Sequence, residues 1–279
     1  MVNRLPTVSA TILVLFGLIA CQQKTRETTG SLPVTLDDSS RIIIDRAIAY
    51  AVGSSHGGDS IWQHKQTLSF DKKSISYDST GKITRELDQH FDYTLMPEFR
   101  AKVSFMLHDT AVLLIHDGQQ ARKLFNGKAS TEQKDIDNAW NSSFGSQFVI
   151  SMPYKLKDPG LKAEYVGRMT LSDGVPAQVV KTSFMKGAGS NPDHIWYYYF
   201  EPGTGKLLAN SLNGKDNFWD YTRYERFDKV DGLLMPAHRK TYVATGLNKP
   251  GRLTGESIHS RITLNKDFPA DHFKLPDEK

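Results

Sequence analysis

The sequence predicts a mainly β fold of the α+β class, with an antiparallel sheet or barrel and few helices. Short stretches of alternating apolar and polar residues follow one another from Leu68 to Leu264, and this is the period of half-buried strands. Turn dipeptides separate the later stretches, among them Asp173-Gly174, Asn213-Gly214 and Asp231-Gly232. Consecutive short strands joined by such turns are typical of antiparallel sheets.

Residues 1–20 have the composition of an export signal. Arg4 is their one charged residue, and residues 10–20 are almost entirely apolar. That run is too short to span a bilayer, which requires about 20 apolar residues. Residues 18–21 (Leu-Ile-Ala-Cys) resemble the lipobox of bacterial lipoproteins, which implies cleavage before Cys21 and lipid attachment to its thiol. The alternative is an ordinary signal peptide in which Cys21, the single cysteine of the chain, is incidental.

Residues 21–40 are polar and lack periodicity, which predicts a flexible tether between the lipid and the folded part. Gln22 follows the cysteine, whereas the enterobacterial sorting rule places aspartate there in lipoproteins kept in the inner membrane. No acidic run of the kind linked to surface display in Bacteroidetes lipoproteins follows Cys21. We therefore expect a lipid-anchored protein of the cell envelope, on the outer membrane and facing the periplasm.

The length after removal of residues 1–20 is enough for one large domain or two small ones, and we expect a single folded domain, residues 41–279, that acts as a monomer. Hydrophobic residues make up 39% of the chain and charged residues 24%, which is enough apolar content for a packed core. Loss of Arg4 with residues 1–20 reduces the formal net charge from +4 to +3. So small an excess predicts no nucleic-acid partner. We expect no cofactor either, because no Gly-rich phosphate loop is present.

The spacing of apolar residues predicts a first helix over residues 40–52. Ile44, Ala47, Ile48 and Ala51 recur at helical intervals, and residues 37–40 offer several N-caps. In the strand that follows, Leu68 and Phe70 alternate with polar residues, but the apolar parity shifts across residues 71–73, which predicts a turn or bulge there. A later stretch, residues 161–171, alternates without a break.

A second helix is predicted over residues 131–152. Its apolar residues recur every four positions, at Ile136, Trp140, Phe144 and Phe148. This stripe can cover one side of the sheet, or it can form a lid over an apolar cavity. Residues 195–200 (Ile-Trp-Tyr-Tyr-Tyr-Phe) form a strand with bulky side chains on both faces. One face must meet the core, and the other lies under the helix, lines a cavity or presents a patch to a partner.

Motifs for catalysis or metal binding are weak. Residues 53–57 (Gly-Ser-Ser-His-Gly) fit the G-x-S-x-G pattern of serine hydrolases, but that motif requires a strand before it and a helix after it, and the predicted context is reversed. The nine histidines are scattered and none has H-E-x-x-H spacing. Acidic residues near aromatics, such as Asp220 beside Trp219 and Tyr221, are too unspecific to indicate a carbohydrate site. We expect no enzyme and no metal.

Several short motifs resemble a group of uncharacterised Bacteroidetes lipoproteins. They are His56-Gly57-Gly58 with Trp62, and residues 154–161, 193–200 and 219–224. The ending, Phe268-Pro269 with residues 273–276, resembles the last strand of LolA/LolB-like proteins. The resemblance implies a strongly curved antiparallel half-barrel, with helices covering its concave side and an apolar cavity that takes lipid or acyl chains.

The leading hypothesis is a non-enzymatic, membrane-tethered binder of an acyl chain or lipid. The helix over residues 131–152 would gate the cavity, and alternating strand residues would line it. The runner-up is a protein-interaction or sensor module that exposes Trp196 and Tyr198, and the third possibility is a hydrolase. The candidate ligand-binding residues are Phe91, Tyr93, Phe105, Leu107, Trp140, Phe144, Phe148, Tyr165 and Met169.

Overall fold

The computed structural model of the chain describes residues 32–53, 58–185, 188 and 194–275. Within these ranges the helices are α1 (Asp38–Val52), α2 (Gly58–Gln63) and α3 (Gln133–Ile150), with short 3₁₀ turns at Tyr154–Lys157 and Lys215–Asn217. The strands are β1 (Thr35–Leu36), β2 (Thr67–Tyr77), β3 (Ile83–Thr94), β4 (Arg100–Leu107), β5 (Thr110–His116), β6 (Ala121–Phe125), β7 (Lys128–Ala129), β8 (Leu161–Thr170), β9 (Pro176–Phe184), β10 (Ile195–Phe200), β11 (Leu207–Asn213), β12 (Trp219–Val230), β13 (Leu233–Ala244) and β14 (Pro250–Leu264).

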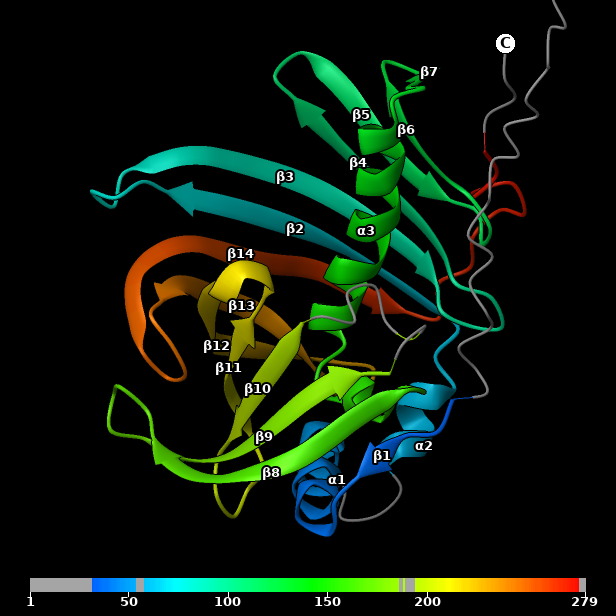
Figure 1. The fold of residues 1–279 in the computed structure, drawn as a ribbon. Coiled ribbons are helices and arrows are strands. Elements are labelled where there is room, and N and C mark those ends of the chain that lie inside the picture. Colours follow the sequence, from blue (N-terminus) through cyan, green and yellow to red (C-terminus); the bar gives the residue numbers. More distant parts are fainter. Residues whose placement is uncertain (1–31, 54–57, 186–187, 189–193, 276–279) are drawn as a thin grey trace, which may run out of the picture.

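All of these strands belong to one sheet, in the order β1-β8-β9-β10-β11-β12-β13-β14-β2-β3-β4-β5-β6-β7. Neighbouring strands are antiparallel except β1, which pairs in parallel with β8. The sheet curves strongly, and α3 lies inside the curve while α1 packs near β8 and β9 at one end (Figure 1). The predicted fold class, a mainly β half-barrel with helices on the concave side, is confirmed.

Helix α1 begins and ends at residues suited to those positions. Asp37 is the N-cap and accepts a hydrogen bond from the Ser40 amide at 2.7 Å, while Gly53 ends the helix in the left-handed conformation with φ of 65°. The second oxygen of Asp37 accepts from the Tyr165 amide on β8 at 2.6 Å. The segment expected to be a tether is therefore folded from Thr35 onward. Residues 1–31, which include Cys21, lie outside the described ranges.

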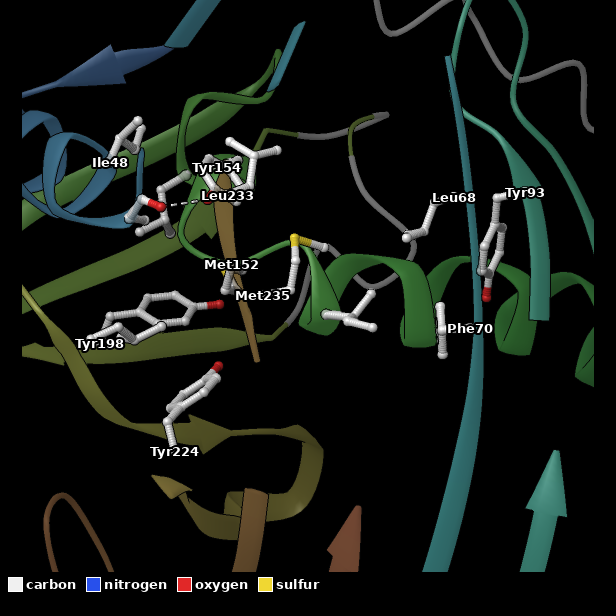
Figure 2. Packing of buried hydrophobic residues seen from close by; sticks show 14 of the residues in the cluster. Ile48, Leu68, Phe70, Tyr93, Met152, Tyr154, Tyr198, Tyr224, Leu233 and Met235 are labelled. Carbon is white, nitrogen blue, oxygen red and sulfur yellow. Dashed lines mark hydrogen bonds between the residues drawn. The ribbon is translucent and has the colours of Figure 1, made fainter. Parts of the chain in front are cut away.

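The main core fills the space between α1 and the concave face of the sheet. Tyr154 stacks on Trp62 with ring centroids 5.1 Å apart, and its hydroxyl donates to the backbone of α1 and β13. Figure 2 shows the methionine side chains of Met152 and Met235 between this end of the core and the Phe70–Tyr93 end. Continuous apolar packing of this kind supplies most of the stability of such a fold.

Strand β2 runs through the predicted break without a turn. Its pairing with β3 is regular from Thr67 to Ser76, so the turn or bulge expected at residues 71–73 is wrong. The parity shift has another cause: Leu68 and Phe70 face the main core, whereas Tyr77 points to the other face and hydrogen-bonds Glu256. Lys72 consequently lies on the same face as Leu68 and Phe70.

Strand β8 contains an irregularity that the alternation of its apolar residues did not predict. The burial alternates along the strand as expected over residues 161–171, but the register against β9 shifts between Tyr165 and Gly167, so the alternating residues do not all share one face. The bulge at Val166 turns the rest of the strand over. Tyr165 packs against the main core, whereas Met169 packs against a second cluster on the opposite face of the sheet. That second cluster consists of Leu171, Ala177, Val179, Tyr199, Leu208, Ala209, Tyr221 and Ala244.

The C-terminal segment is fastened to the outer face of the sheet by Asp92. The buried Asp92 carboxylate accepts from the Ser69 hydroxyl at 2.6 Å and contacts His272 Nε2 at 2.8 Å. Burial alone would raise the pKa of Asp92, but the hydrogen bonds of Ser69 and His272 outweigh that effect and hold its pKa below the ordinary value. Residues 270–273 form a turn here, so the ending that resembles a last LolA/LolB-like strand is not a strand.

Replacing Asp92 with Asn should lower the free energy of unfolding by roughly 1–3 kcal/mol at pH 7, because Ser69 and His272 lose a charged partner. The lowered folded pKa makes this contribution complete above the unfolded pKa of about 4, and it is lost as the pH falls through the folded value. Urea unfolding at pH 7 and pH 3 measures both effects. Asp88→Asn, exposed on the same face of β3, is the control, and an equal loss in both variants would contradict this role of Asp92.

Candidate functional site

A cavity of about 520 Å³ lies between α3 and the concave face of the sheet. This volume is within the roughly 300–1,000 Å³ range of pockets that hold small ligands. The walls come from strands β2–β6 on one side and β10–β13 on the other, with α3 across them. The curvature of the sheet creates this space, because a flat sheet would lie against the helix along its whole length.

One half of the cavity is apolar. Strands β3 to β6 are consecutive neighbours at one end of the sheet, and they present a continuous hydrocarbon and aromatic wall. The polar side chains on this wall are Arg85, Gln89 and Lys123, and Lys123 forms a salt bridge with Asp135 at 2.9 Å. The apolar wall residues are Leu87, Phe91, Val103, Phe105, Leu107, Val112, Leu114 and Phe125.

The other half of the cavity is polar. Strands β11 to β13 contribute side chains that carry hydrogen-bonding or charged groups, and Lys72 on β2 stands between the two halves. The polar wall residues are Asn210, Asp220, Thr222, Arg239 and Thr241. A ligand that fills the whole cavity must therefore have one apolar and one polar part.

Helix α3 presents small and polar residues to the cavity. They are Asn138, Ser142, Gly145, Ser146 and Val149. The predicted stripe lies on the other flank of the helix, because residues two positions apart, such as Trp140 and Ser142, point about 200° apart on a helix. Between the two flanks, the buried residues Ala139, Ser143, Gln147 and Ile150 face the sheet.

The aromatic stripe of α3 seals the core beside the cavity. Phe144 stacks on Phe99 with ring centroids 4.5 Å apart, and Trp140 lies 4.6 Å from the His116 ring. Phe148 contacts Phe184 and Trp196. The alternative in which the stripe covers the sheet is thus the one the structure shows, and the expected gate of Trp140, Phe144 and Phe148 is not formed over the cavity.

The structure places the predicted strand residues in three environments. Phe91, Phe105 and Leu107 line the cavity. Tyr93 is fully buried among Phe70, Phe91 and Phe99. Tyr165 packs at the edge of the main core. Neither tyrosine borders the cavity.

Met169 lies on the opposite face of the sheet because of the bulge in β8, so its expected place in the lining is wrong. Trp196 from the aromatic strand borders the cavity instead.

Both faces of the aromatic strand β10 are covered. Tyr198 and Phe200 belong to the main core, and Tyr199 belongs to the second cluster, where its hydroxyl is 2.9 Å from Ser211 Oγ. Tyr198 is 1% exposed. The exposed aromatic patch that motivated the sensor hypothesis is therefore not present at Tyr198.

Lys72 is the site residue that sequence analysis missed. Burial first, and then the nearby positive charge of Arg239, lowers the pKa of Lys72 to about 8. Its ammonium group contacts Ser146 Oγ of α3 at 3.4 Å and lies 5.4 Å from the Phe91 ring. The sequence did contain an indication: Lys72 has the same parity as Leu68 and Phe70, and an unbroken strand would place all three on one face.

Arg239 and Asp220 face each other across the polar half. Arg239 is 9% exposed, and its Nε has no hydrogen-bond partner among the described residues. Burial raises the pKa of Asp220 to about 6, while the backbone of Leu212 and the charge of Arg239 act in the opposite direction. One oxygen of Asp220 is also without a hydrogen-bond partner in the described residues. Unpartnered buried polar atoms are costly, and they mark places where a ligand group or water completes the structure.

Other candidate chemistry is weakly supported. Ser69, Asp92 and His272 include the residue types of a hydrolase triad, but the carboxylate lies between the other two, so no base contacts the hydroxyl. Residues 54–57, including Ser55 and His56 of the G-x-S-x-G pattern, lie outside the described ranges, and the helix α2 follows them instead of the expected strand. The described residues contain no cluster of three or more His, Asp or Glu side chains suited to a metal ion.

The fold and the cavity together define a class of protein: one curved antiparallel sheet around a helix, with a ligand-sized hollow between them. Residues 37–217 match the model of a family of unknown function, DUF6503, and the chain belongs to this family. A search of curated proteins found no match. Among the helices of the described ranges, none combines the length and apolarity that crossing a bilayer requires.

Solved structures share the fold at low sequence identity. A DUF1329 family protein from Desulfovibrio piger superposes with a TM-score of 0.54 at 10% identity, over 84% of this chain and 96% of its own. A LolA superfamily protein from Nitrosomonas europaea superposes with a TM-score of 0.53 at 9% identity, over 84% of this chain and 97% of its own. The predicted LolA-like architecture is thereby confirmed.

Replacing Lys72 with Met should raise the free energy of unfolding by roughly 1–3 kcal/mol at pH 7, because it removes a partly buried cation that has no salt-bridge partner among the described residues. The folded pKa of about 8 lies below the ordinary value of 10.5. The cost of burying the charge is therefore complete below pH 8 and disappears as the pH rises toward 10.5.

Chemical denaturation at pH 7 and pH 10 measures this difference, which should shrink at the higher pH. Lys73→Met is the matched control, since Lys73 is on the other face and pairs with Glu86 at 2.8 Å. If Lys72→Met destabilises the protein at pH 7, the charged Lys72 ammonium group does not lower the free energy of unfolding as its surroundings indicate.

Proposed function

We propose that this protein is a membrane-anchored lipoprotein of the cell envelope that binds the acyl chain of a lipid in its cavity, without catalysing a reaction. The observation that carries the proposal is the 520 Å³ hollow with an apolar half on β3 to β6. Apolar wall that stays open to solvent is unfavourable, and burying hydrocarbon against it contributes about 25 cal/mol per Å² before the costs of association. A LolA superfamily protein shares the architecture, which is compatible with a binding or carrier role.

The N-terminal sequence supports the proposed location. Lipid on Cys21 would hold the protein at a membrane, and more than one acyl chain is needed for stable anchoring. With Gln22 after the cysteine, the proposal places the protein on the periplasmic face of the outer membrane. The short motifs that resemble Bacteroidetes lipoproteins support an envelope lipoprotein, and we propose that the chain comes from a bacterium of that group.

Filling the cavity from α3 tests acyl-chain binding. Gly145 lies in the cavity wall, and a Cβ added there would meet no atom within 4 Å. A large side chain at this position can therefore enter the hollow without displacing the core. Gly145→Trp should weaken the binding of a fluorescent fatty acid by about tenfold or more, as expected when an indole occupies the space of the ligand.

Gly145→Ala is the matched control for this experiment. It should leave binding unchanged and raise the free energy of unfolding by about 0.5–1 kcal/mol, because Ala is favoured over Gly inside a helix. Lipid extraction of the purified wild-type protein, followed by mass spectrometry, gives an independent measurement. Absence of both co-purified lipid and fatty-acid binding in the wild type would overturn the proposed function.

The anchoring proposal is tested separately at Cys21. Cys21→Ser should abolish incorporation of radiolabelled palmitate in growing cells, because the thiol is the proposed acceptor of the lipid. The variant should also move from the membrane fraction to the soluble fraction. Retention of the label in Cys21→Ser would show that the lipid is attached elsewhere.

A further inference from the structure

Two cationic side chains from different strands reach the same end of the cavity. Lys72 comes from β2 and Arg239 from β13, and only β14 separates these strands in the sheet. The two are close enough for the positive charge of Arg239 to lower the pKa of Lys72. Neither forms a salt bridge with a carboxylate of the described residues, although the described part of the chain pairs many of its more exposed cations, such as Lys73, Lys181 and Arg100.

The guanidinium of Arg239 is hydrogen-bonded on one side, but its Nε has no hydrogen-bond partner among the described residues. The phenol of Tyr224 is hydrogen-bonded to the Arg239 side chain, and Tyr198 lies beside both. Figure 2 shows the hydroxyl ends of Tyr198 and Tyr224 turned toward the same region of the interior. Both phenols are neutral, because burial raises the pKa of Tyr224 to about 12 and that of Tyr198 well above its ordinary value. A buried guanidinium with an unpartnered Nε is a donor prepared for an anion.

The charges at this end of the cavity do not balance. Asp220 is the one carboxylate among the residues that line the cavity, and it stands against Lys72 and Arg239. His259, buried beside them on β14, adds no charge, because burial and the two cations hold its pKa well below the ordinary value. One net positive charge therefore remains at the end of the cavity formed by Lys72, Arg239 and Asp220, and a ligand group with a single negative charge would neutralise it. Arg85, in the β3 part of the lining, adds a further positive charge to the cavity as a whole.

The polar and apolar halves of the cavity set the shape of that ligand. An anionic group between Lys72 and Arg239 would lie at the boundary of the polar half, and a chain extending from it over Phe91 and Phe105 would lie against the apolar half. We propose that the ligand is a single-chain amphiphile with a monoanionic headgroup, a long-chain carboxylate, whose headgroup is bound by Lys72 and Arg239. This inference rests on the proposed function of acyl-chain binding and adds the chemistry of the headgroup to it.

The geometry also accounts for the presence of a lysine where the strand pattern calls for an apolar residue. Leu68 and Phe70 precede Lys72 on the same face of β2 and are both fully buried. A cation in the next position is unfavourable in the empty protein and becomes favourable when a carboxylate pairs with it. Lys72 thus lowers the stability of the free protein and raises its affinity and specificity for an anionic ligand.

Palmitate and hexadecanol, two probes with the same chain length and different headgroups, test the inference by displacement of a bound fluorescent fatty acid. Wild-type protein should prefer palmitate by about tenfold or more, because charge-assisted hydrogen bonds contribute roughly 1.5–3 kcal/mol each. Lys72→Met and Arg239→Gln should each weaken palmitate binding by about tenfold and leave hexadecanol binding unchanged. Lys73→Met, one residue away on the opposite face, should bind both probes as the wild type does.

Comparing Lys72→Met with Arg239→Gln distinguishes a loss of palmitate binding from a loss of folding. Arg239→Gln removes a buried, partly hydrogen-bonded group and can destabilise the protein, whereas Lys72→Met is expected to stabilise it, so weaker palmitate binding by Lys72→Met cannot come from unfolding. Equal affinity of the wild type for the two probes, or palmitate binding unchanged in Lys72→Met, would overturn the headgroup assignment while leaving acyl-chain binding intact. If neither probe binds to the wild type, the proposed function itself fails.

Discussion

The curvature of one sheet is the constraint on which the rest of this structure depends. A strongly bent antiparallel sheet has more concave surface than α1 and α3 can cover, because two helices packed at one end and across the middle leave part of the wall uncovered. The main core fills the region near α1, where Ile44, Ile48 and Tyr154 are almost completely buried. The cavity is the remainder of the same concave surface, under the small-residue flank of α3. Core and binding site are thus adjacent parts of one interior.

Much of the fold was predictable from local patterns. The turn dipeptides predicted that consecutive later strands pair as antiparallel neighbours, as β12 and β13 do across Asp231-Gly232. A tight turn with positive φ at both of its residues brings the two strands it joins side by side. Helix α1 was predictable from its caps and its apolar spacing. The curvature of the sheet could not be predicted from local patterns, because it accumulates from small twists of many strands. Only the resemblance to LolA/LolB-like proteins implied it.

The candidate site was predictable only in part, and the errors have physical causes. Phe91, Phe105 and Leu107 were expected in the lining and are there, because the alternation of β3 and β4 is regular. Met169 was misplaced because a bulge at Val166 reverses the face of β8. The local indication of that bulge is Gly167, a glycine inside the strand with a φ of 136°. The stripe of α3 was assigned to the cavity because it is apolar, but the flank of the helix that faces an amphipathic hollow is the one with Ser142 and Ser146.

The bulge in β8 has a consequence for the way the molecule holds together. Two separate hydrophobic clusters lie on the two faces of the sheet, and in many proteins such clusters belong to units that open independently. Here β8 contributes to both: Leu161 and Ala163 lie in the main core, and Leu171, directly after the strand, lies in the second cluster. The neighbouring strands β9 and β10 also contribute to both clusters. Loss of packing in one cluster would therefore disturb strands that also pack in the other. Because the two clusters share several strands, we expect both faces of the sheet to unfold together as one cooperative unit, although the apolar interior is divided in two.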